Sequence, residues 1–132
     1  MQEKLEKLRQ NKFLEISSWA GLSPTPGSQG IIITKDKKIY YYHKYYRISE
    51  NFKDKVKPED ISGGIVIDED IYLKLVNYLE EKVIGKEFEE INIRDAGVNI
   101  SGTLNNNSFN IHNHFDISND LEKIIYSKEK AE

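Results

Sequence analysis

The chain has 132 residues, of which 38% are hydrophobic and 31% are charged, and its formal net charge is −3 at pH 7. This length fits one domain with a sizeable core, and the composition lies well short of the disordered class. The near-neutral charge excludes attraction of the whole molecule to nucleic acid or to an anionic membrane, and the absence of cysteine excludes disulfides, thiolate metal sites and cysteine nucleophiles.

The N-terminal segment, residues 1–12, is charged throughout and predicts a short helix over residues 2–12, with Leu5 and Leu8 on its apolar face. A helix of this length is marginal alone, so we expect it to dock on the rest of the fold. The segment lacks the apolar run of a signal peptide, and no stretch approaches the roughly 18 apolar residues of a membrane-spanning helix. Together with the absence of cysteine, these features predict a cytoplasmic protein.

The segment that follows has the composition of β-structure. Runs of β-branched and aromatic residues are separated by stretches rich in Gly, Pro and Lys, which is typical of strands joined by turns. The predicted elements are a strand over residues 13–19, a loop over 21–30, a strand over 31–34, a turn over 35–38 and a second hairpin arm over 39–48. Residues 49–64 contain Pro58 and two glycines, and they are predicted to be irregular.

A short apolar strand over residues 64–67 precedes the clearest helix of the chain. Asp68 is a good N-cap residue, and the acids after it suit the positive end of the helix dipole. Apolar residues then recur at i+4 spacing, which indicates one buried helix face. These residues are Ile71, Leu75, Leu79 and Val83. Gly85 then provides a natural stop.

From Phe88 onward, the pattern predicts a three-strand meander. Its parts are a strand over residues 90–94, a turn over 95–97, a strand over 98–104, a turn over 105–108 and a strand over 109–115. Asp116 or Ser118 then caps a final helix. The apolar stripe of this helix consists of Ile117, Leu121, Ile124 and Ile125. Residues 127–132 are expected to form a loose tail.

Together these elements predict a single α+β domain over residues 1–132. We expect a mainly antiparallel sheet of about five or six strands, packed against the central helix and the C-terminal helix.

Charge and tyrosine are unevenly distributed along the chain. Residues 35–57 hold five of the eight tyrosines, and they hold eight basic residues against three acidic ones. Residues 59–90 hold ten acidic residues against three lysines. Such a division of a nearly neutral chain indicates recognition of a partner.

Three roles fit the tyrosine-rich strand. In the simplest, one face packs on the core and the other forms cross-strand aromatic pairs. Alternatively, the strand anchors a protein interface, because tyrosine and arginine are favoured there. In the third, the tyrosines stack single-stranded nucleic-acid bases beside basic side chains that bind phosphates. The candidate partner-binding residues are Lys37, Tyr40, Tyr42, Lys44, Tyr45, Tyr46, Arg47 and, beside the Pro/Gly loop, Trp19.

Two histidines in the C-terminal part raise the question of metal binding. On an extended strand, Asn110, His112, His114 and Asp116 would share one face. A His-x-His pair suits a transition metal, with Asp116 as a third ligand and an open position for hydrolysis. The simpler interpretation is the solvated face of an amphipathic strand. We therefore expect no metal or other cofactor, and a protein that is not an enzyme.

The acidic helix supplies a second candidate contact surface. Glu80 and Glu81 are predicted to lie on its solvated face. If the partner is a nuclease, such a face would mimic the phosphates of its substrate and steer association.

The order of these features resembles that of the small immunity proteins that neutralise bacterial contact-dependent or polymorphic toxins. The features are Trp19-Ala20-Gly21 before a Gly/Ser loop, a tyrosine-rich hairpin, a central amphipathic helix, a strand ending in Asp95-Ala96-Gly97 and a closing helix. The resemblance implies a non-enzymatic inhibitor that blocks a toxin's active site or a partner surface. Small phage proteins that disable host defence systems have the same layout, so a phage-encoded inhibitor stays open as an alternative.

Overall fold

The computed structural model describes residues 2–20, 27–45, 59–89, 91 and 96–127. The helices are α1 (Gln2–Gln10), α2 (Glu69–Lys82) and α3 (Phe115–Ile125). The strands are β1 (Lys12–Ala20), β2 (Gly27–Thr34), β3 (Lys38–Tyr45), β4 (Glu59–Val66), β5 (Ala96–Leu104) and β6 (Asn107–His112).

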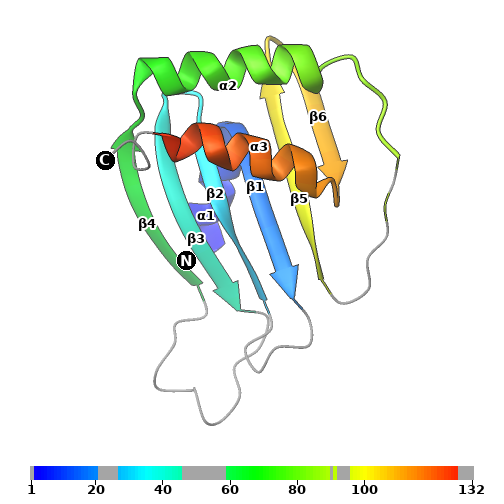
Figure 1. Ribbon diagram of the computed structural model, residues 1–132. Coiled ribbons are helices and arrows are strands. Elements are labelled where there is room, and N and C mark those ends of the chain that lie inside the picture. The colour runs from blue at the N-terminus through cyan, green and yellow to red at the C-terminus, as the bar shows by residue number, and fades with distance from the viewer. Residues whose placement is uncertain (1, 21–26, 46–58, 90, 92–95, 128–132) are drawn as a thin grey trace.

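The described strands form one sheet of six, in the order β4-β3-β2-β1-β5-β6 (Figure 1). Every neighbouring pair is antiparallel. The expected α+β fold, with an antiparallel sheet of about five or six strands packed against a central and a C-terminal helix, is therefore confirmed. The first β-hairpin is longer than predicted, because β2 begins at Gly27 rather than at Ile31.

The helices lie on both faces of the sheet. α2 and α3 cover one face, called the α2/α3 face below, while α1 lies behind the sheet on the opposite α1 face (Figure 1). The larger core lies between the sheet and the two helices α2 and α3. It includes Leu14 and Ile100 from the sheet, Leu75 and Leu79 from α2, and Leu121 from α3. The i+4 stripes predicted for both helices thus supply the buried side of each.

A smaller apolar cluster docks α1 on the other face. Leu5 is 2% exposed and packs with Ile32 and Tyr42 of the sheet, and Leu8 and Ile61 lie at the margin. This contact stabilises a nine-residue helix that would be marginal alone.

The segment predicted to be irregular over residues 49–64 is partly a strand. β4 begins at Glu59, and it carries a bulge opposite Ile39 and Tyr40 of β3. Gly63 and Gly64 at this bulge have φ values of 104° and 91°, which glycine adopts without steric cost. The two glycines that looked like a strand breaker therefore bend a strand without ending it.

The predicted turn over residues 95–97 is wrong at its last two positions, because Ala96 and Gly97 begin β5. Gly97 lies opposite Trp19 of β1, and a Cβ at Gly97 would overlap the Trp19 ring. The glycine is therefore a site of ring packing within the sheet. Of the strand predicted over residues 90–94, only Ile91 is described, and it lies outside any strand.

The last strand is shorter than predicted, since β6 ends at His112. Asn113 has a φ of 63°, and its side-chain oxygen accepts a hydrogen bond from the Val98 amide at 3.0 Å. Its side-chain nitrogen donates to the Ile91 carbonyl. These side-chain hydrogen bonds hold the backbone at the end of β6, and the chain then turns directly toward the start of α3. The N-cap is His114 rather than Asp116 or Ser118. The predicted loose tail lies outside the described residues from residue 128 onward.

Candidate functional site

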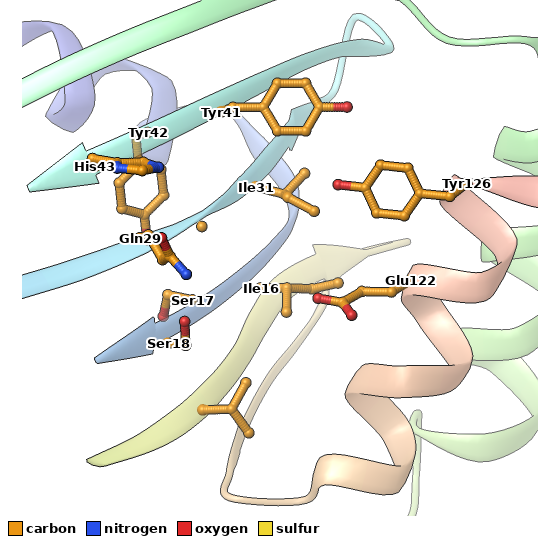
Figure 2. A pocket seen from close by; sticks show the side chains of 12 residues that line it. Ile16, Ser17, Ser18, Gln29, Ile31, Tyr41, Tyr42, His43, Glu122 and Tyr126 are labelled. Carbon is orange, nitrogen blue, oxygen red and sulfur yellow. The ribbon is translucent and has the colours of Figure 1, made fainter. Parts of the chain in front are cut away.

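The main candidate site is a cavity of about 220 Å³ between the sheet and α3, called the α3 hollow below (Figure 2). Its lining residues come from the sheet, from the C-terminal half of α3 and from Tyr126, the C-cap residue of that helix. They are Ile16, Ser17, Ser18, Gln29, Gly30, Ile31, Tyr41, Tyr42, His43, Val98, Glu122 and Tyr126.

The sheet register builds the floor of the α3 hollow in two rows. Tyr41 of β3 lies opposite Ile31 of β2, which lies opposite Ile16 of β1. In the second row, His43 lies opposite Gln29, and Gln29 lies opposite Ser18. Because alternate strand residues share a face, both rows point toward α3. The floor is therefore apolar and aromatic in one row and polar in the next.

The helix supplies the opposite wall. Glu122 and Tyr126 are four residues apart, so they lie on the same side of α3 beside its buried stripe. Figure 2 shows the Glu122 carboxylate and the Tyr126 hydroxyl directed from the helix toward the sheet. Both side chains are half-buried, as is Tyr41, whereas His43 and Gln29 are exposed. Among the described residues that line the hollow, Glu122 is the one with a formal charge at pH 7.

A buried polar network lies on the α1 face of the same strands. Glu15 is 4% exposed and accepts a hydrogen bond from the Tyr42 hydroxyl at 2.6 Å. Arg9 of α1 contacts the same carboxylate at 3.1 Å, and Lys12 contacts it at 3.0 Å. The Lys12 ammonium also donates to the Ser101 hydroxyl at 2.8 Å. The carboxylate is fully paired, and the network fastens α1 to β1 and β3.

Burial acts to raise the pKa of Glu15, but the Tyr42 hydrogen bond and the charges of Arg9 and Lys12 outweigh it and hold that pKa below its ordinary value. Burial and the adjacent carboxylate in turn raise the pKa of Tyr42 well above its ordinary value. The network is therefore most favourable with Glu15 ionised and Tyr42 protonated.

We predict that this network makes stability depend on pH at both ends of the range. Glu15 contributes stability above the unfolded carboxyl pKa of about 4.3, and that contribution is lost as pH falls through the lower folded pKa. Tyr42 contributes stability that declines as pH rises above the unfolded tyrosine pKa of about 10. Urea unfolding of wild type and Tyr42→Phe from pH 3 to 11 measures both effects. The stability difference between the two proteins should be largest between these limits. A difference that is constant with pH would contradict the prediction.

The predicted contact residues fall in different places. Tyr42 is 1% exposed beneath α1, so its prediction as a surface contact is wrong. Its ring reaches Glu15 across Gly30, which lacks the side chain that would block it. Tyr40 is half-buried on the same α1 face, and Trp19 is half-buried over Gly97.

The basic candidates also separate. Lys37 lies in the turn before β3, where its ammonium pairs with Glu69 at 3.0 Å and lies 4.6 Å from the Tyr72 ring centroid. Lys44 and Tyr45 are the last residues of β3. Tyr46 and Arg47 lie outside the described residues. Of the described residues of β3, Tyr41, Tyr42 and His43 line the α3 hollow, and Tyr41 and His43 lie on the α2/α3 face.

The structure does not place the candidate metal ligands on one strand face. His112 ends β6 and is exposed, whereas His114 caps α3 and donates from Nε2 to the Glu89 carbonyl at 2.7 Å. Asp116 lies in the first turn of α3. The predicted common strand face does not exist, because the backbone turns at Asn113. In the described part of the chain, no group of three or more potential ligands is positioned to hold a metal ion.

Of the residues that line the α3 hollow, only Tyr42 is among the contact candidates that the sequence predicts. The side chains that the prediction misses include Ser18, Gln29, Tyr41, His43, Glu122 and Tyr126. The i+4 spacing of Glu122 and Tyr126, one position past Leu121 and Ile125, was the available signal for the helix pair. The sequence gives no comparable signal for Ser18 and Gln29. Composition predicts a loop at Gln29, and only the observed start of β2 at Gly27 places Gln29 opposite Ser18.

Comparisons with models of known protein families and with curated proteins give no match for this chain. None of the described helices combines the length and the apolar character needed to cross a membrane.

Proposed function

We propose that the protein binds a bacterial protein partner through the α3 hollow and the neighbouring sheet surface, and that it acts as a non-enzymatic inhibitor of that partner. The observation that carries the proposal is a preformed hollow between two half-buried tyrosines, Tyr41 and Tyr126. Tyrosines bury a large area at low entropic cost, and they are enriched where interfaces concentrate their binding energy.

The surroundings of the hollow support a protein partner. Exposed His43 and Gln29 border the two tyrosines, which gives an aromatic centre with a polar rim. A stable complex buries about 800 Å² on each partner, so contact must extend well beyond this hollow. In the sequence, residues 35–57, which include β3, are basic, and a basic segment favours an acidic partner surface.

The inhibitor role rests on the layout resemblance to toxin-immunity proteins and on the division of charge along the chain. Glu80 and Glu81, both exposed on α2, form a competing contact surface for a basic partner such as a nuclease. A phage-encoded inhibitor of a host defence system would use the same kind of surface. The two surfaces are separable by mutation.

We predict that Tyr41→Ala weakens partner binding by at least about tenfold, because a central interface tyrosine contributes roughly 2 kcal/mol or more. The partner is first recovered by affinity capture from host lysate, with and without nuclease treatment, and binding is then measured with purified components. Tyr40→Ala is the matched control, since it makes the same change on the same strand but on the opposite face.

Two outcomes would contradict this proposal. Equal partner binding by wild type and Tyr41→Ala would show that the α3 hollow is not part of the interface. Loss of partner binding in a Glu80→Ala/Glu81→Ala variant would then assign the interface to α2. Recovery that depends on nucleic acid and disappears on nuclease treatment would favour the single-stranded nucleic-acid interpretation.

A further inference from the structure

We infer that the α3 hollow is a receptor for an arginine side chain of the protein partner, an inference that rests on the proposed function. Three properties of the lining lead to it: the charge of Glu122, the rings of Tyr41 and Tyr126, and the apolar floor between them. Each property suits a different part of the same side chain.

The charge sets the sign of the ligand. Glu122 carries the one formal charge among the lining residues that the structure describes, and it is half-buried at the wall of the hollow. A partly buried carboxylate interacts with a cation more strongly than one in open water. The same carboxylate repels an acidic side chain, so the hollow discriminates by charge as well as by shape.

The aromatic rings favour a flat cation. Tyr41 projects from the sheet and Tyr126 projects from α3 toward it, so a ligand that enters the hollow meets a ring from each side (Figure 2). Cations bind to the faces of aromatic rings. A guanidinium also stacks on rings and forms two parallel hydrogen bonds to one carboxylate, which an ammonium does not.

The floor suits the rest of the side chain. Ile16 and Ile31 line the same hollow, where Figure 2 shows Ile31 near the two tyrosines and Ile16 near Glu122, and they offer apolar contact to the three methylene groups of arginine. Gln29 and Ser18 in the next row carry oxygens that accept hydrogen bonds from the remaining guanidinium protons. The volume of about 220 Å³ is below the usual range for drug-sized ligands and suits a single long side chain.

The test is a titration of the ¹⁵N-labelled full chain with N-acetyl-L-arginine amide, followed by two-dimensional NMR. The matched probe is N-acetyl-L-citrulline amide, which has the same shape without the charge. We expect shifts at Gln29, Tyr41, Glu122 and Tyr126, and an affinity for the arginine probe at least about tenfold higher than for the citrulline probe.

Variants separate the contributions of charge and ring. Glu122→Gln should weaken arginine binding about tenfold, whereas Glu6→Gln, with the same change of net charge at an exposed position on α1, should leave it unchanged. Tyr126→Phe keeps the ring and should retain binding, whereas Tyr126→Leu should reduce it. Equal affinity for the two probes, or no effect of Glu122→Gln, would overturn the inference.

This experiment needs no partner, so the two proposals fail separately. If Tyr41→Ala abolishes partner binding but the arginine probe shifts no NMR signal from the hollow, the proposed interface is supported and the arginine inference is wrong. If the arginine probe binds as expected but Tyr41→Ala captures the partner normally, the hollow binds guanidinium and the proposed interface is wrong.

Discussion

Replacing Glu15 by alanine is expected to lower the free energy of unfolding by about 3 kcal/mol, because it removes the common acceptor of a buried network. The Glu15 carboxylate pairs with Tyr42, Arg9 and Lys12 at once. Its loss leaves the Tyr42 hydroxyl buried without this acceptor, and it places two cations beside each other. The expected loss lies at the low end of the range for a broken buried ion pair. The reason is that Arg9 and Lys12 are partly exposed, so water can solvate their charges once the carboxylate is gone.

Equilibrium unfolding in urea measures this loss. Glu6→Ala is the control, since Glu6 is exposed on α1 and the substitution makes the same change of net charge. We expect Glu6→Ala to change stability by less than about 0.5 kcal/mol. A Glu15→Ala protein as stable as wild type would mean that the network contributes specificity of packing without net stability.

A double-mutant cycle measures the coupling between Glu15 and Tyr42. Tyr42→Phe alone removes a hydrogen bond to a charged acceptor, and its cost should largely vanish once Glu15 is alanine. Additive costs would show that Tyr42 acts through its ring, packed with Leu5 and Ile32, rather than through its hydroxyl.

Much of the fold could be predicted from local patterns in the sequence. The i+4 repeat of Ile71, Leu75 and Leu79 indicates a buried helix face without any information on what packs against it. The predicted ends of α2 are therefore correct to within a residue or two. The run of β-branched isoleucines in β2 and the run of tyrosines in β3 likewise indicate strands. These signals depend on neighbours a few positions away, and they survive without knowledge of the tertiary structure.

The errors arose where distant residues decide the backbone. Asn113 ends β6 because its side chain bonds to Val98 and Ile91, which are 15 and 22 positions away. Ala96 and Gly97 continue a strand because Trp19, on another strand, packs over the glycine. From local sequence alone, the strand is expected to continue through Asn113, and Ala96 and Gly97 are expected to form a tight turn.

The candidate site was harder to predict than the fold. The tyrosine content of β3 is visible in the sequence, but the burial of Tyr42 is not, because it follows from the docking of α1 on one face of the sheet. The hollow itself needs residues from β1, β2, β3, β5 and α3 to meet. No periodicity in the chain encodes the register that brings Ser18, Gln29 and His43 into one row.

The α3 hollow depends on how firmly α3 is held, which makes Leu121 the most sensitive position of the helix. Leu121 is fully buried in the larger core, and it immediately precedes Glu122. Leu121→Ala is expected to lower the free energy of unfolding by about 2–5 kcal/mol, the usual cost of such a cavity. The exposed neighbour Lys123→Ala is the control on the same helix, with an expected change below about 0.5 kcal/mol.

Leu121→Ala should also weaken the binding of the arginine probe under conditions where the variant is still folded. A cavity under α3 loosens the helix that positions Glu122 and Tyr126, so the two walls of the hollow lose their fixed spacing. Probe affinity of Leu121→Ala, measured by NMR well below its unfolding midpoint, should fall while Lys123→Ala keeps wild-type affinity. If Leu121→Ala loses stability but binds the probe normally, then the packing of α3 on the core does not set the geometry of the hollow. In that case the ligand's own contacts with Glu122 and the two rings hold the helix in place.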